Sequence, residues 1–385
     1  MIEKVLREFL FIILLSAAVG VARAVGADSY VCPERSGDSA VQDIITVESD
    51  SVVAPEQKSP NLIKRLSNEL TTRYFSSKYD SNYVVRPEGK LTLKIRLNQT
   101  GNTFHAKGTL KEVYSKTDLS TSHKTTVSIG ASYRGLSAAL SLNPAKMSGA
   151  YKDYELNLNY YSSRISIDFS YLRSETLSGD IIRDRSNWTD YDERTNLQRL
   201  EHGDATLKVV NMAIYYTFNH RRFSYSAAFT QSYIQRRSAG SWLAGISYQG
   251  GSIKTNEELK ARSPNAAEVS MKVGHIGIGG GYGFNWVPGK KWLLHLSLLP
   301  TVVVYNNNNL SVNGESIDAQ HIRLNMIFNE RAAIVYNFSL KKHSKASRYF
   351  AGATLVMNNS IFDDKAVTIN QNKWRARAFI GVRLY

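Results

Sequence analysis

The stretch Leu91-Thr92-Leu93-Lys94-Ile95-Arg96-Leu97-Asn98 decides the fold. Apolar and polar residues alternate along it without a break, and successive side chains of a β-strand point to opposite faces. One face of this segment is therefore apolar and the other is polar or charged. The same period returns along the chain, for example at 165–169, 210–218, 292–298 and 374–384. This pattern predicts an all-β protein made of antiparallel hairpins.

The composition agrees with strands. The 385 residues include 22 Tyr, 14 Phe and 5 Trp but only 8 Pro, and aromatic side chains pack well on pleated surfaces. A hydrophobic content of 43% with 21% charged residues argues against disorder over most of the chain. One Cys excludes a disulfide scaffold and a Cys-rich zinc module. The formal net charge is +15, but no basic helix accompanies it, so we expect no nucleic-acid partner.

The N-terminus has the features of an export signal. Lys4 and Arg7 precede an apolar run at 9–21, which ends in Ala22-Arg23-Ala24. A basic start, a short apolar run and a small-x-small site are typical of a signal peptide. We therefore expect residues 1–24 to be removed on export, the alternative being an uncleaved anchor.

Residues 25–75 are expected to form a flexible leader and a short helix. The helical part begins near Pro60, which is tolerated at a first helical position. Leu62, Leu66 and Leu70 then recur every four residues. We place this helix at the periplasmic mouth of the following domain, and a loosely ordered surface helix remains the alternative.

Residues 76–385 are expected to form a transmembrane antiparallel β-barrel. The predicted strands are about ten residues long, which suits a tilted membrane-spanning strand. Tyr and Trp collect at strand ends, as in aromatic girdles. An exported chain with such strands satisfies its backbone in lipid by closing into a barrel. A soluble sandwich is the alternative, and the predicted location is the outer membrane of a Gram-negative cell.

The number of strands is less well defined. Thirteen strand segments are expected, at 91–98, 125–133, 136–142, 152–161, 164–173, 207–218, 222–233, 240–250, 268–286, 291–306, 319–339, 346–358 and 374–385. Single-chain bacterial barrels have even strand numbers. We therefore favour about 12 strands, with the segment at 91–98 as the doubtful one, and 14 remains open.

The connections between strands suggest an orientation. Long connections are expected outside the cell, at 174–206, 307–318 and 359–373. The tight turn at Pro288-Gly289 is expected on the periplasmic side.

A run of alternate glycines, Gly277, Gly279, Gly281 and Gly283, resembles a phosphate-binding loop on first inspection. These glycines lie on one face of a predicted strand instead of at a strand-to-helix turn, and no Lys-Ser/Thr pair follows them. We expect them to make room inside the barrel or to allow a bend.

The polar face of the later strands supplies candidate lumen-lining residues, which are Arg323, Arg331, Arg375, Arg377, Arg383, His275 and His295. The arginines have two alternative roles. Facing carboxylates such as Asp168, they would brace a narrow bore. Facing water, they would bias a pore toward anions. We favour bracing, because side chains largely fill a barrel of about this size.

Catalytic and metal sites are not expected. His275 and His295 share a polar face and could meet in the lumen, and a dyad would need a serine such as Ser297. The sequence shows no Ser, His and Asn on adjacent strand positions, as in barrel phospholipases, so a structural role is favoured. The acidic connection at 174–206 could hold a divalent ion, but a solvated loop is favoured. No His pair has metal-ligand spacing, and no cofactor is expected.

Four segments resemble a known family. They are 80–87 (DSNYVVRP), 91–98 (LTLKIRLN), 223–229 (FSYSAAF) and 235–245 (QRRSAGSWLAG). The resemblance runs from about residue 75 to the end and is to DUF4421, an uncharacterised family of exported Bacteroidetes proteins. It implies an outer-membrane barrel, but it brings no activity and no functional residues. The most specific block, from Gln235 to Trp242, is interpreted as a basic turn at the membrane boundary.

The expected function is therefore that of a porin-like outer-membrane barrel with a structural or small-solute transport role and no enzymatic activity. Its expected partners are outer-membrane lipid and the barrel assembly machinery, with no ligand identified. A barrel enzyme acting on envelope lipid is one alternative. A receptor or assembly partner for other envelope proteins is another.

Overall fold

The computed structural model describes residues 78–87, 91–110, 113–122, 124–133, 136–142, 153–184, 197–263, 266, 268–312, 314–317, 325–339, 348–363 and 367–384. The expected signal peptide, leader and short helix lie outside these residues, as does Arg323.

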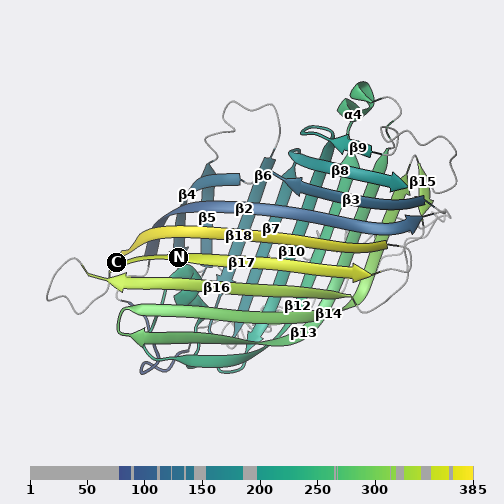
Figure 1. The fold of residues 1–385 in the computed structure, drawn as a ribbon. Coiled ribbons are helices and arrows are strands. Elements are labelled where there is room, and N and C mark those ends of the chain that lie inside the picture. The colour runs from purple at the N-terminus through teal and green to yellow at the C-terminus, as the bar shows by residue number, and fades with distance from the viewer. Residues whose placement is uncertain are drawn as a thin grey trace, which may run out of the picture. The chain divides into compact units, whose positions relative to one another are not determined.

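The described part of the chain forms a closed ring of twelve antiparallel strands (Figure 1). In ring order they are β2 (Leu91–Leu110), β4 (Lys124–Tyr133), β5 (Leu136–Leu142), β6 (Asp153–Tyr161), β7 (Ile165–Ser174), β10 (Ala205–Thr217), β12 (Ala239–Thr255), β13 (Val269–Gly289), β14 (Trp292–Val312), β16 (Met326–Phe338), β17 (Tyr349–Asp363) and β18 (Val367–Leu384). The last strand pairs with the first over eighteen residues, from Val367↔Gly108 to Leu384↔Leu91. The predicted all-β barrel of about 12 strands is confirmed.

One predicted strand is wrong, and it is not the doubtful one. The segment 91–98 lies within β2, which pairs with both β4 and β18. The segment 222–233 does not join the wall and instead contains a short π-helix, η3 (Ser226–Thr230). Its serines and its apolar residues are both buried, whereas a wall strand exposes one of its two faces. The alternating pattern alone does not distinguish a strand of the wall from a segment buried on both faces.

Three further strands extend the sheet beyond one end of the ring. The C-terminal half of β2 pairs with β3 (Val113–Thr121). Strand β3 in turn pairs with β8 (Leu177–Asp184), and β8 pairs with β9 (Leu197–Leu200). Another short strand, β15 (Glu315–Ile317), pairs with β14, and the helix α4 (Glu257–Arg262) links β12 to β13.

The expected long connections therefore hold more strand than predicted. Part of 174–206 forms β8 and β9, and β14 continues to Val312. Most of 359–373 belongs to β17 and β18. The tight turn falls at Lys290–Lys291, directly after the predicted Pro288-Gly289. These strands are longer than a bilayer requires, so the wall extends beyond the part whose outer face is apolar.

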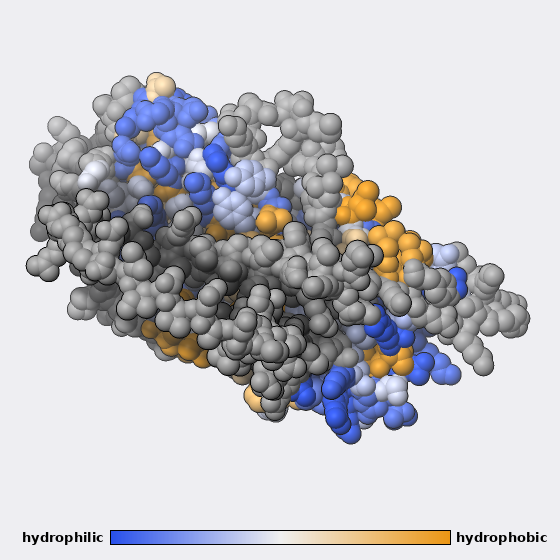
Figure 2. All heavy atoms as spheres, turned by 180° about the vertical axis from the view of Figure 1, so that it is seen from behind, coloured by the Kyte–Doolittle hydropathy of each residue, from blue (hydrophilic) through white to orange (hydrophobic). Residues whose placement is uncertain are grey.

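The two faces of the wall have opposite chemistry. In β2, Ile95 is 58% exposed, whereas the neighbouring Lys94 and Arg96 are only 3% and 6% exposed. Ile129 and Leu296 are likewise exposed on the outer face of β4 and β14. Figure 2 shows hydrophobic residues grouped on parts of the outer wall and hydrophilic ones grouped toward opposite ends. An apolar exterior around a polar interior is the arrangement of a transmembrane barrel.

Aromatic side chains line the outer wall near the tight-turn end. Trp242 packs edge-on against Tyr282, with ring centroids 5.2 Å apart, and Trp292 lies 4.7 Å from Tyr336. Amphipathic rings of this kind settle at headgroup level. No helix among the described residues has the length and hydropathy of a membrane span.

The glycine run lies on the inner face of β13, as expected. A Cβ on Gly279 or Gly281 would overlap a backbone carbonyl of β14, and one on Gly283 would meet the ring of Phe223. These glycines permit close approach of β14 and of the segment inside the barrel.

The outward face of β18 supplies a test of the membrane-facing wall. Ile380 is 56% exposed in the apolar zone, whereas Asn372 is exposed on the same face, two residues beyond Trp374. We expect Ile380→Arg to lower the free energy of folding into bilayers by about 2–4 kcal/mol, and Asn372→Arg by about 0–1 kcal/mol. Reversible urea titration in lipid vesicles measures both. Equal losses would contradict the placement of the apolar zone.

Candidate functional site in the barrel lumen

In the connection from β10 to β12, residues 223–235 are buried or half-buried inside the barrel and are called here the inner segment. Phe223, Ala228 and Gln231 have no exposed surface. Its strand β11 (Ile234–Gln235) pairs with β1 (Val84–Val85), so residues preceding the barrel join it. The Ser226 hydroxyl donates a 2.7 Å hydrogen bond to the carbonyl of Tyr161 on β6. The inner segment thus fills the lumen near the tight-turn end.

Two buried cations hold the inner segment at Gln231. Lys94 donates to the Gln231 side-chain oxygen at 2.7 Å and to the carbonyl of Thr230 at 3.3 Å. Arg383 donates from Nε to the Gln231 carbonyl at 2.9 Å. Gln231 has a φ of 57°, in the left-handed region, so these contacts stabilise a conformation that non-glycine residues rarely adopt.

A second anchor runs through a chain of hydrogen bonds on β13 and β14. The Asn285 amide donates to the carbonyl of Ser224 and to the Gln235 side chain, both at 3.0 Å. His295 Nδ1 lies 2.7 Å from the Asn285 oxygen, and His295 Nε2 lies 2.9 Å from the Ser297 hydroxyl. All of these groups are buried. The sequence did not reveal this set, because Asn285 is on the neighbouring strand.

An ion pair spans the lumen between β7 and β16. Arg331 forms a salt bridge with Asp168, and its guanidinium lies 4.6 Å from the Tyr215 ring centroid. The Asp168 carboxylate also accepts hydrogen bonds from Tyr215, at 2.7 Å, and from Tyr161 and Asn159. The carboxylate is thus fully hydrogen-bonded, as a buried charge requires.

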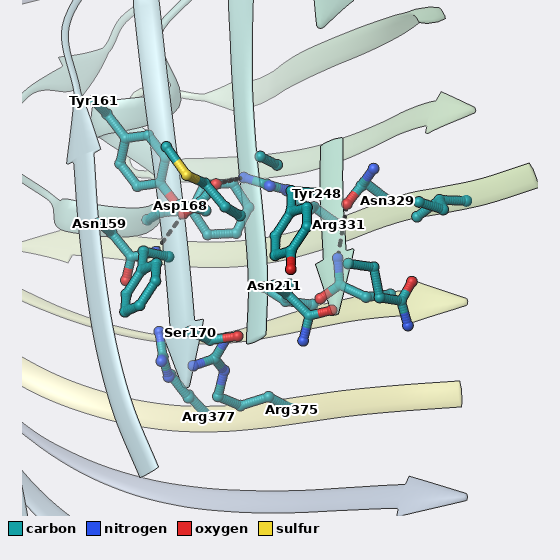
Figure 3. Close-up of a pocket in the computed structure, with 18 residues that line it drawn as sticks. Asn159, Tyr161, Asp168, Ser170, Asn211, Tyr248, Asn329, Arg331, Arg375 and Arg377 are labelled. Atoms are coloured by element: carbon teal, nitrogen blue, oxygen red, sulfur yellow. Dashed lines mark hydrogen bonds and ion pairs between the residues drawn. The ribbon is translucent and has the colours of Figure 1, made fainter. Parts of the chain in front are cut away.

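A second set of cations lies on β18, beside β2. Glu155 on β6 lies 3.7 Å from Lys373 and 3.6 Å from Arg375. Arg377 projects from the same strand beside Arg375 (Figure 3). We call Arg96, Arg375 and Arg377 the arginine cluster.

Arg375 and Arg377 of the arginine cluster border a small cavity. Its volume is about 30 Å³, where one water needs roughly 10–15 Å³ by the same measure. Arg375, Arg377, Asn211 and Ser170 line it together with other polar and apolar side chains (Figure 3). The cavity has room for a few waters or a small ion.

The structure separates the remaining candidate residues. The β13–β14 register places His295 opposite Asn285, ten positions from His275, or about 33 Å along a strand. The two histidines therefore do not meet. His275 stacks on Phe362, with ring centroids 3.7 Å apart.

The described residues of the acidic connection form ion pairs, and they include no group of three or more potential ligands placed to hold a metal. Asp180 pairs with Arg199 at 3.0 Å, and Arg262 pairs with both Asp204 and Glu201.

The Asp168–Arg331 pair gives a measurable consequence. Asp168→Asn leaves the buried Arg331 charge without its counterion, so we expect the free energy of unfolding to fall by about 3–5 kcal/mol. The double variant Asp168→Asn with Arg331→Gln should recover much of this loss, because it removes both charges. Urea titration in vesicles, followed by Trp fluorescence, checks both. If the changes in the free energy of unfolding caused by the two single substitutions were fully additive in the double variant, the result would contradict a direct ion pair.

Comparison with solved structures gives low-similarity matches to outer-membrane proteins. The chain is 11% identical to the outer membrane protease OmpT of Escherichia coli, with a TM-score of 0.37, covering 77% of this chain and 97% of that one. It is 10% identical to the translocator domain of the autotransporter NalP of Neisseria meningitidis, with a TM-score of 0.32, covering 76% of this chain and 88% of that one. It is 12% identical to an outer membrane channel of Pseudomonas putida F1, with a TM-score of 0.29, covering 79% of this chain and 98% of that one. No curated protein matches the chain.

A family model gives a more extensive match. It covers residues 78–384, which include β1 at one end and β18 at the other, and its description is a domain of unknown function. The resemblance predicted from the sequence is confirmed over this range. The chain belongs to the DUF4421 family.

Proposed function

We propose that this protein is an outer-membrane β-barrel with a structural or small-solute transport role, and that its resting bore is closed at the tight-turn end. The observation that carries the proposal is the inner segment, which is buried and hydrogen-bonded to the wall. Lys94, Asn285 and Arg383 contact it from three different strands.

The location follows from the chemistry of the wall. The apolar exterior needs a hydrocarbon environment, and a closed ring satisfies its backbone there without helices. Barrels of this kind are typical of outer membranes. Outer-membrane lipid and the machinery that assembles barrels are therefore its proposed partners.

The lumen beyond the inner segment is narrowed by cross-lumen contacts. Gln249 on β12 donates to Gln371 on β18 at 2.9 Å, and Asn329 on β16 donates to Ser247 on β12 at 2.9 Å. The Asp168–Arg331 pair adds a charged contact. These bonds favour a closed bore over a standing water-filled pore.

Conductance tests the closed bore. We expect wild-type protein in a planar bilayer to show little steady conductance, because the inner segment fills the bore. Asn285→Ala removes two hydrogen bonds to that segment, each worth about 1 kcal/mol, and should increase the frequency of open events. Asn98→Ala is the matched control, since its amide bonds only to Thr126 and Ser128 on β4 among the described residues. A large steady wild-type conductance would contradict the proposal.

One observation favours a second function, hydrolysis of envelope lipid. Ser297, His295 and Asn285 form the hydroxyl–imidazole–amide sequence of a nucleophilic site. The rings of Phe223, Tyr225 and Phe229 lie 5.1–5.8 Å from His295, and Ser297 is only 4% exposed. Since Asn285 also holds the inner segment, we propose that this set is an anchor and that the protein is not an enzyme.

A serine-reactive probe separates these two functions. We expect a fluorophosphonate to leave wild-type protein unlabelled, because the Ser297 side chain is only 4% exposed beside the inner segment. Esterase activity toward short-chain lipid esters should match that of Ser297→Ala. Labelling that disappears in Ser297→Ala would support the enzyme instead.

A further inference from the structure

The lumen carries an excess of positive charge near the inner segment and the cavity. The described inward-facing cations there are Lys94, Arg96, Arg331, Lys373, Arg375, Arg377 and Arg383. The described inward-facing acids there are Glu155 and Asp168. Asp168 is committed to Arg331, which leaves Glu155 as the acid nearest to the arginine cluster.

Glu155 does not neutralise that cluster. Its carboxylate is shared between Lys373 and Arg375 at 3.7 and 3.6 Å, longer than a charge-assisted hydrogen bond. No carboxylate among the described residues lies within ion-pair distance of Arg377 or Arg96. The charges of Arg96, Arg375 and Arg377 lie close enough to repel one another.

Several donors of the cluster have no hydrogen-bond acceptor among the described residues. They are Nε and one terminal nitrogen of Arg96, Nε and one terminal nitrogen of Arg375, and Nε of Arg377. Arg96 and Arg375 are only 6% and 7% exposed. Across the cavity, the buried Asn211 amide nitrogen also has no described acceptor. Buried cationic donors without acceptors are costly, and a bound anion removes that cost.

The fold makes space for these guanidinium groups. A Cβ at Gly130 on β4 would overlap the Arg96 guanidinium, so that group lies over a position where only glycine leaves room. Arg375 and Arg377 are two residues apart on one strand and present their side chains to the same cavity (Figure 3).

We propose that the arginine cluster and the Asn211 amide form a binding site for a small inorganic oxyanion of the phosphate or sulfate class. The planar guanidinium fork matches two oxygens of such an anion. The small volume of the cavity favours an inorganic anion over one with an organic substituent. The site deepens the proposed function by naming the class of small solute that the lumen retains.

Calorimetric titration of full-length, detergent-solubilised protein with inorganic phosphate, in a buffer free of other oxyanions, tests the site. We expect saturable binding by the wild type. Arg377→Gln should weaken it by at least about tenfold, the effect of losing one charge-assisted hydrogen bond. Lys208→Gln, which removes an exposed charge from β10, is the matched control and should bind as the wild type does. Absence of saturable wild-type binding, or equal affinity in Arg377→Gln, would overturn the proposal.

Two additional arms keep the test decisive. If Arg377→Gln does not fold, Arg377→Lys keeps the charge but loses the fork, and it should still weaken binding. Glycerol 3-phosphate, which represents a lipid headgroup, should bind much more weakly than phosphate. Equal binding of the two would overturn the assignment to an inorganic anion.

Calorimetry tests the anion site, whereas conductance tests the closed bore, so either proposal can fail without the other. A barrel that conducts steadily but binds phosphate would reject the closed bore and keep the site, and a closed barrel without phosphate binding would do the reverse.

Discussion

Closure of β18 onto β2 is the constraint on which the rest of the structure depends. A free sheet edge in hydrocarbon leaves a row of backbone donors and acceptors unsatisfied, at several kcal/mol for each group. The eighteen paired residues between these strands remove that edge. Figure 1 shows the consequence directly, since the first long strand lies beside the last in the wall. Once the ring is closed, each strand has one face toward lipid and one toward the lumen.

Closure also forces the charges inward. Lys94, Arg96, Arg375 and Arg383 belong to the two closing strands, and all four are buried. Each needs an acceptor inside a narrow space. Lys94 and Arg383 use the backbone and side chain of Gln231. Arg331 elsewhere in the wall uses Asp168, and the arginine cluster is left with a single distant carboxylate.

The wall was predictable from the sequence, but the segment inside the lumen was not. Strict alternation in segments such as 91–98 and 374–384 gives the strands and their outward faces, because one face must meet lipid. The strand count followed from the preference for even numbers, although the doubtful segment proved real. The inner segment shows why alternation alone fails: Phe223 and Tyr225 alternate with serines, yet both sets are buried against the wall.

Pairing across the lumen depends on register and shear, which a single sequence does not supply. Arg331 and Asp168 lie 163 positions apart, so only the closed barrel brings them together. The same holds for His295 and Asn285, whose contact is set by a hairpin register. His275 and His295 looked equivalent on their strands, but the register places them at different depths.

The position of the inner segment also couples it to closure of the ring. It connects two neighbouring strands in mid-ring, and its contacts include Lys94 on the first closing strand and Arg383 on the last. Without the inner segment, Lys94 would lose its described acceptors, and Arg383 would keep only its described bond to Asn337 on β16. Pairing of the closing strands and docking of the inner segment therefore stabilise each other, because both use Lys94 and Arg383.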